Sequence, residues 1–288
     1  MTSSVPVRLP KQPANGITLK LDRSLCKWHW LEQSLLFCEL SRLSYFPESL
    51  VKPIFEDAGI TECKFIDREG AQAYILGNKN DLMIICRGTE PHDWNDLRAD
   101  ANAMTVLFDV GRLHAGFKSE VDELWPIIER VIRENQRPTW FAGHSLGGAM
   151  STICAGRCKL SSIPSNPRAL FTYGSPRVGN GVFINAVKLA HYRWVNNNDI
   201  VTRIPPRWLG YRHSGFELYC DHRNRLRKVY SWQRSMDRFR GLWKGLFRGS
   251  LDYLSDHSNL EYIRILRGLL TDFRSGKPLI EPRVRIDE

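Results

Sequence analysis

The sequence contains no run of about 18 or more apolar residues, the length that a helix needs to cross a bilayer, so it predicts no membrane-spanning segment. Residues 1–16 mix proline, basic and small polar residues and lack the apolar centre of a secretory signal. They predict a disordered N-terminal arm ahead of a single domain at residues 17–288. With 288 residues and 42% hydrophobic content, the chain can bury a full core.

Recurring metal-ligand and disulfide patterns are also missing. The eight histidines show neither H-x-x-x-H nor mixed Cys/His spacing, and we expect no metal and no cofactor. The seven cysteines form an odd set without C-x-x-C, which favours free thiols in a reducing compartment. The expected location is cytoplasmic or peripheral to a membrane, with export that needs no signal peptide as the alternative.

One short segment indicates nucleophilic catalysis. Gly143, Ser145 and Gly147 form G-x-S-x-G between a strand-like run at residues 139–142 and a small-residue helical pattern at 148–155. A serine at a sharp strand-to-helix turn needs small neighbours two positions away, since strand and helix pass closely there. The turn also directs the N–H of Leu146 toward a developing oxyanion. The alternative is a glycine-rich connection whose serine caps the helix.

A matching acid and base follow in the order Ser, Asp, His. Asp199 comes just after a strand-like run at 192–195, and His257 directly precedes a helical pattern of leucine and isoleucine. An imidazole at a helix start can reach the serine, while a carboxylate at a strand end orients its other nitrogen. Other candidates for the base and the acid are His191, His213 (in a strand-like segment at 211–219), His222, Asp252 and Asp256.

Several further motifs resemble the class 3 lipase family of α/β-hydrolases. They are Cys86–Pro91, His114–Phe117, Phe171–Asn180, Asn197–Val201 and Asp256–Ser258, in this order. The resemblance implies a mostly parallel central sheet with helices on both faces. It also implies that Thr89 is the second oxyanion donor, and that residues between Thr89 and His114 form a lid. An ordinary packed crossover is the alternative for that segment.

The hydrophobic patterns predict secondary structure that agrees with this fold. Period-3.6 and alternating patterns favour a helix at 27–43, strands at 64–67, 72–77 and 82–87, and a helix at 116–134 that is bent at Pro126. From there to Pro206 helices and strands alternate, which is typical of a mostly parallel sheet.

An unusual insertion at residues 223–250 precedes His257. Between Arg223 and Arg248 nine basic residues face one acid, a local charge of +8 against +10 for the whole chain. Aromatic and apolar residues recur there at steps of three and four, so we expect a basic amphipathic helix. Such a helix suits an anionic membrane surface. The alternative is a cap packed on the enzyme, and nucleic acid is not expected because no recognition fold accompanies the charge.

The combined patterns predict a serine carboxylic-ester hydrolase acting on lipid esters, namely a lipase, with a phospholipase as a further option. Ser145 attacks the ester, His257 takes its proton and Asp199 orients the imidazole. Two other functions fit the same sequence features. One is a membrane- or protein-binding module on a vestigial hydrolase fold; the other is an acyltransferase with the same triad, distinguishable by its products when alcohol is added.

Overall fold

A computed structural model describes residues 16–88, 104–197, 199–227 and 257–282. The arm expected at residues 1–16 therefore lies outside the described residues except for Gly16, and the insertion does so from residue 228 to 250. Among the described helices, none has both the length and the apolar character required to cross a membrane.

The centre of the molecule is an eight-stranded sheet in the order β1-β2-β3-β6-β7-β9-β11-β12. The run from β3 to β11 is parallel, whereas β1, β2 and β12 join antiparallel at the two edges. The strands are β1 (Glu62–Arg68), β2 (Ala71–Gly77), β3 (Leu82–Cys86), β6 (Thr139–His144), β7 (Pro167–Tyr173), β9 (Ala190–Asn196), β11 (Phe216–Cys220) and β12 (Leu226–Arg227).

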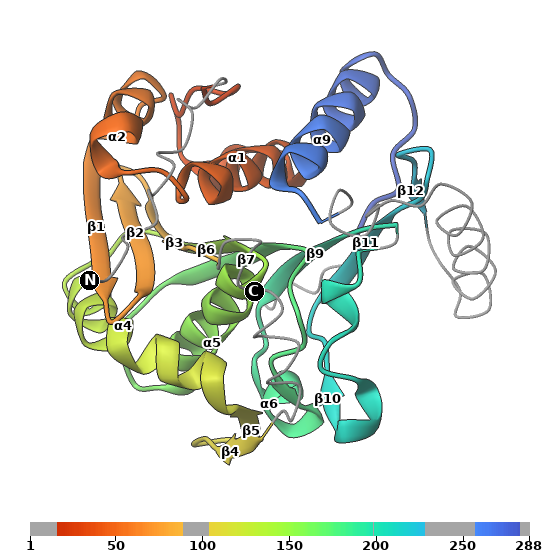
Figure 1. Ribbon diagram of the computed structural model, residues 1–288. Coiled ribbons are helices and arrows are strands. Elements are labelled where there is room, and N and C mark those ends of the chain that lie inside the picture. The colour runs from red at the N-terminus through yellow and green to blue at the C-terminus, as the bar shows by residue number, and fades with distance from the viewer. Residues whose placement is uncertain (1–15, 89–103, 198, 228–256, 283–288) are drawn as a thin grey trace, which may run out of the picture.

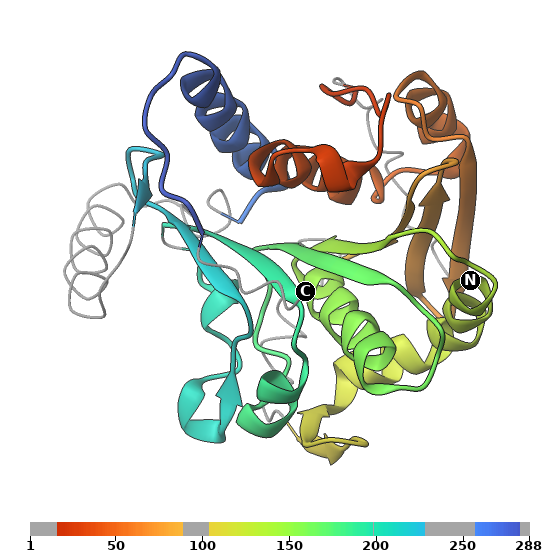
Figure 2. The same cartoon turned by 180° about the vertical axis from the view of Figure 1, so that it is seen from behind.

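Helices cover both faces of this sheet (Figures 1 and 2). On one face lie α1 (Trp30–Leu43) and α9 (Asn259–Arg274), and on the other α4 (Ala115–Arg133) and α5 (Leu146–Leu160). The α/β-hydrolase fold class is therefore confirmed. The remaining helical segments are α2 (Glu48–Asp57), α6 (Gly181–Ala186), η1 (Leu25–Lys27), η3 (Val201–Arg203) and η4 (Arg207–Leu209).

A second, smaller sheet in the order β10-β8-β5-β4 lies away from α1 and α9 (Figure 1). Its strands, all antiparallel, are β4 (Thr105–Leu107), β5 (Arg112–His114), β8 (Gly179–Asn180) and β10 (Tyr211–Arg212). The described part of the segment expected to form a lid contains β4 and continues into β5; residues 89–103 lie outside the described residues.

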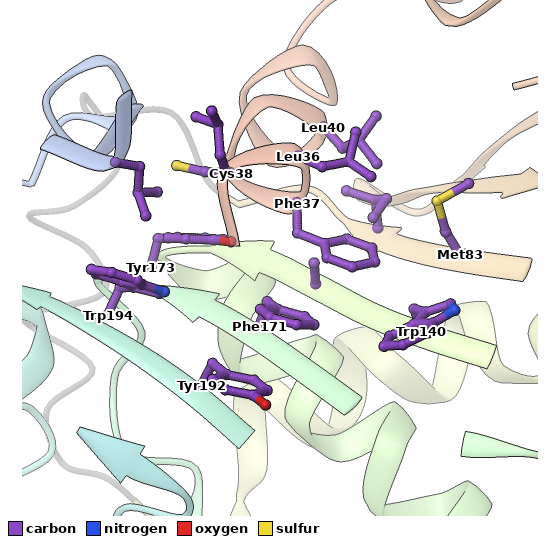
Figure 3. Packing of buried hydrophobic residues seen from close by; sticks show 14 of the residues in the cluster. Leu36, Phe37, Cys38, Leu40, Met83, Trp140, Phe171, Tyr173, Tyr192 and Trp194 are labelled. Atoms are coloured by element: carbon purple, nitrogen blue, oxygen red, sulfur yellow. The ribbon is translucent and has the colours of Figure 1, made fainter. Parts of the chain in front are cut away.

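Alternating side chains of the central strands build two hydrophobic clusters, one on each face of the sheet. On β6, Trp140 points toward α1 while its neighbour Phe141 belongs to the cluster under α4 and α5. On the α1 side the aromatic rings stack in series, with centroids of Phe37 and Phe171 4.7 Å apart and those of Phe171 and Tyr192 4.8 Å apart (Figure 3). Burial on both faces fits the apolar sequence of β3, whose five residues are all buried.

Helix and strand boundaries follow local chemistry. The helix expected at 27–43 begins at Trp30, because His29 caps it: the His29 ring accepts from the N–H of Leu31 and Glu32 closes a capping box. Pro126 lies inside α4 and does not end it.

The strand-like reading of residues 211–219 as one segment was wrong. Tyr211–Arg212 pairs in the small sheet, and Phe216–Cys220 pairs with β9 in the large one. Gly215 separates them with φ +74°, a conformation that leaves the extended region, and a Cβ there would collide with His191.

Candidate active site

Ser145 occupies a strained turn between β6 and α5. Its φ of 61° and ψ of −131° are outside the regions that a residue with a side chain prefers, at a cost of about 1–3 kcal/mol. The N–H of Ser145 donates to the carbonyl of Tyr173 at 2.9 Å, which ties the turn to β7. Its buried hydroxyl has no hydrogen-bond partner among the described residues. A strained, unengaged serine at a strand end is the arrangement expected of a nucleophile.

The two glycines of the motif are required by close backbone contact. A Cβ on Gly143 would collide with the backbone of Gly147 and Gly148, and a Cβ on Gly147 would collide with the backbone from Cys86 to Gly88. This crossing of α5 over the ends of β3 and β6 is the physical reason for the G-x-S-x-G spacing.

Asp199 and His257 lie together, as the sequence predicts. Nδ1 of His257 is 3.0 Å from each carboxylate oxygen of Asp199, and both side chains are buried. The carboxylate also accepts the N–H of Val201 at 3.0 Å. Because the carboxylate is an acceptor, Nδ1 carries the ring proton, and Nε2 is the basic nitrogen of His257.

A tyrosine that sequence reasoning did not single out completes the carboxylate's environment. The hydroxyl of Tyr262 donates to Oδ2 of Asp199 at 2.7 Å and accepts the N–H of Asn196 at 3.0 Å. Burial and the nearby Asp199 raise the pKa of Tyr262 well above its usual value, so the hydroxyl stays a donor. The sequence does hold one indication of this role: Tyr262 lies on the apolar face of the helix with Ile263 and Leu266, and a buried tyrosine hydroxyl needs a hydrogen-bond partner.

His144, the residue before the serine, holds the backbone of His257. Its Nε2 lies 2.6 Å from the carbonyl oxygen of His257, and the two rings are 4.5 Å apart. A carbonyl only accepts, so Nε2 bears the proton and Nδ1 accepts from the hydroxyl of Tyr45 at 3.1 Å. Burial, and then His257, lower the pKa of His144 well below its usual value and keep this ring neutral.

Gly174, inside the predicted Phe171–Asn180 motif, makes room for the acid–base pair. Its φ is +60°, and a Cβ there would lie 2.6 Å from Oδ2 of Asp199 and 2.8 Å from Nδ1 of His257. The motif was recognised from sequence, but the need for glycine at this position is visible only in the structure.

Of the two predicted oxyanion donors, Leu146 and Thr89, the structure describes Leu146 alone. Leu146 is the first residue of α5, so its N–H has no partner within the helix and lies at the positive end of the helix dipole. Thr89 lies outside the described residues, and its role remains a prediction. Among the described residues no group of three or more His, Cys, Asp or Glu is placed to hold a metal ion.

The competing histidines have other partners or surroundings. The ring of His191 is buried between the hydroxyls of Thr172 and Ser214, at 2.8 and 2.7 Å. Nε2 of His213 donates to the carbonyl of Thr202 at 2.7 Å. His222 is exposed, and Asp252 and Asp256 lie outside the described residues.

Comparison with known proteins agrees with this geometry. Residues 83–208 match the family described as lipase (class 3). Over this segment the chain resembles the class 3 lipase family. It is 38% identical over 117 residues to a secreted mono- and diacylglycerol lipase of Fusarium solani, covering 38% of this chain and 34% of that protein. It is 31% identical over 151 residues to the toxin TseL of Vibrio cholerae, covering 52% and 23%.

A solved structure shares the fold of this chain. The triacylglyceride lipase of Rhizomucor miehei matches with a TM-score of 0.54 and 25% identity, covering 65% of this chain and 78% of that one. The chain spans about a third or less of the two curated relatives named above.

Proposed function

We propose that this protein is a serine carboxylic-ester hydrolase that acts on lipid esters. The observation that carries the proposal is the hydrogen-bonded pair of His257 and Asp199, held through His144 to the strained turn that presents Ser145. The lipid-ester substrate class is supported by the named activities of the relatives, a mono- and diacylglycerol lipase and a triacylglyceride lipase.

The proposed mechanism uses the buried pair directly. Nε2 of His257 takes the proton of the Ser145 hydroxyl as its oxygen attacks the ester carbonyl, and Asp199 stabilises the imidazolium that forms. The N–H of Leu146, with Thr89, holds the oxyanion. The imidazolium then gives its proton to the leaving alcohol, and an acyl-enzyme remains. His257 next activates a water that releases the acid and restores the serine.

The nucleophile is tested by replacing Ser145 with alanine. We expect Ser145→Ala to abolish hydrolysis of p-nitrophenyl butyrate and palmitate, because no other group forms the acyl-enzyme. Ser151→Ala is the matched control: its buried hydroxyl donates to the carbonyl of Ala142 at 2.6 Å, without contact to the acid–base pair. Turnover retained in Ser145→Ala would disprove the assignment. Faster turnover of the palmitate ester, or of lipid in vesicles, would identify a lipase.

We also propose that the basic segment from Arg223 to Arg248 attracts the enzyme to anionic membranes, which would place it at the membrane periphery. The support is its local charge of +8 together with interleaved aromatic residues. Each basic side chain near such a surface contributes about 1 kcal/mol. Co-sedimentation with phosphatidylserine vesicles should fall when three cations of the segment become glutamine (Arg234, Arg238 and Lys244). It should not fall when three exposed cations elsewhere do (Arg68, Arg168 and Lys188).

A further inference from the structure

A cavity of about 280 Å³ lies on the face of β9 and β11 that is turned away from α1 and α9. Arg193 and Glu217 line it from directly paired positions on the two strands, while Trp194 and Leu218 point into the hydrophobic cluster on the other side. The cavity is separate from the acid–base pair, since neither Asp199 nor His257 lines it.

The walls of this cavity carry an excess of positive charge. Among the described residues that line it, four are arginines and a single one, Glu217, is a carboxylate. That carboxylate already forms a salt bridge with Arg193 at 2.7 Å, and both side chains are largely buried. The other lining arginines are Arg177, Arg203 and Arg207. His213 adds no charge, because it donates from Nε2 to a backbone carbonyl and burial lowers its pKa well below the usual value.

Arg177 shows that this charge is partly uncompensated. Its Nη1 donates to the backbone carbonyls of Arg203 and Pro205, the latter at 2.8 Å, and carbonyls carry no full negative charge. Its Nε is buried and has no hydrogen-bond partner among the described residues. Burial, followed by Arg207 and Arg193, lowers the pKa of Arg177 to about 10. A buried donor amid like charges is costly unless an anion accompanies it.

We propose that this cavity binds a phosphate group. Guanidinium groups bind phosphate through paired N–H···O bonds, and an anion of nearly two negative charges matches several arginines better than a carboxylate does. The volume is small for a ligand pocket, so it suits a compact anion or a headgroup rather than an acyl chain. Phosphate in a lipid headgroup and inorganic phosphate share this chemistry.

The cavity adjoins the loop that carries Asp199. Thr202, which lines it, donates its hydroxyl to the Asp199 carbonyl at 2.9 Å, and the N–H of Arg177 donates to the carbonyl of Ile204 at 2.7 Å. A phosphate held here would therefore stabilise the segment that positions the acid. The proposal does not depend on ester hydrolysis, because none of these contacts involves Ser145.

Calorimetric titration of inorganic phosphate into the Ser145→Ala protein, at constant ionic strength in sodium chloride, tests the proposal. We expect saturable binding to one site per chain. Arg207→Gln should raise the Kd about ten-fold or more, since it removes a charged donor. Arg207 is exposed, and the hydrogen bonds that tie it to the fold are accepted by its backbone carbonyl, from the N–H of Gly210 and the side chain of Arg212, so the substitution leaves them in place. Arg168→Gln removes an equal charge from the start of β7, outside the cavity, and should leave the Kd unchanged.

A parallel titration with soluble dihexanoyl phosphatidic acid identifies the source of the phosphate. Binding of both probes, each weakened by Arg207→Gln, assigns the cavity to lipid headgroups; binding of inorganic phosphate alone assigns it to the free ion. Absence of saturable binding in the parent protein would overturn the proposal. An affinity for acetate equal to that for phosphate would also overturn it. So would a Kd for phosphate that is unchanged in both Arg207→Gln and Arg203→Gln.

Discussion

The imidazole of His144 donates a hydrogen bond of 2.6 Å to the backbone carbonyl of His257, although 113 residues separate the two histidines. One residue after His144 the chain forms the strained turn at Ser145. The hydrogen bond therefore fixes the base relative to the nucleophile through the backbone, and the carboxylate fixes the ring. Among the described residues, one contact on the main chain and one on the side chain of His257 help to fix its position.

Replacing His144 with phenylalanine keeps the packed ring and removes its donor. We expect His144→Phe to lower kcat about ten- to a hundred-fold, because small displacements of a catalytic group are costly, and to leave KM nearly unchanged. Tyr45→Phe, which removes the donor to the far side of the same ring, should have a smaller effect in the same direction. Steady-state kinetics on a soluble ester measures both, and a change confined to KM would contradict this role.

Tyr262→Phe removes one donor from the Asp199 carboxylate. The carboxylate is then held less firmly against the imidazole of His257, so we expect kcat to fall roughly ten-fold, as for the loss of a hydrogen bond to a charged group. Tyr74→Phe is the control, because its hydroxyl donates at 2.8 Å to the carbonyl of Phe46, away from the site. The prediction fails if Tyr262→Phe and Tyr74→Phe both keep the parent's kcat in steady-state kinetics on a soluble ester.

Gly174→Ala should inactivate the enzyme, because the new Cβ would displace Asp199 and His257. Gly70→Ala offers a matched comparison: its φ of +92° imposes a similar backbone cost, about 1–2 kcal/mol, but no atom lies within 4 Å of the added Cβ. Both proteins should unfold at lower temperature than the parent, and only Gly174→Ala should lose ester hydrolysis. Equal activity in the two variants would show that the space beside the acid–base pair is not needed.

Thr89→Ala tests the expected second oxyanion donor. Loss of one such donor typically lowers turnover about 10²–10³-fold, so we expect a fall in kcat of that order with an unchanged unfolding temperature. The matched comparison is Thr152→Ala, whose hydroxyl donates to a carbonyl within α5. Unchanged turnover in Thr89→Ala would remove this residue from the site.

The stability of the fold should depend on pH through its buried neutral histidines. Burial lowers the pKa of His191 to about 3, whereas a histidine of the unfolded chain titrates near pH 6.5. Between these values the unfolded state binds the extra proton, so stability is complete above about pH 6.5 and decreases as the pH falls. Each such histidine contributes a slope of about 1.4 kcal/mol per pH unit.

Urea unfolding at pH 5.5 and 4.5 measures this slope. The free energy of unfolding should decrease less between the two pH values for His191→Gln than for the parent, by about 1.4 kcal/mol. His144 and His213, whose pKa values are also lowered, keep the remaining slope in the variant. An equal slope in both proteins would show that His191 does not carry this effect.

The fold class and the candidate triad can both be predicted from the sequence alone. Apolar strands such as 82–86 and the G-x-S-x-G turn carry local signals, because alternation, helix period and tight turns depend on near neighbours in the chain. The order of Ser145, Asp199 and His257 could likewise be read along the chain.

The groups that surround those residues become visible in the three-dimensional structure and not before. Tyr262 reaches Asp199 across 63 residues, and the four arginines of the phosphate cavity come from β9 and from the segments after β7 and β9. Gly215 divides an apparently continuous strand between two sheets. Such contacts depend on how parallel strands align side by side, and this alignment leaves no periodic trace in the sequence, since the residues that meet are separated by whole helices.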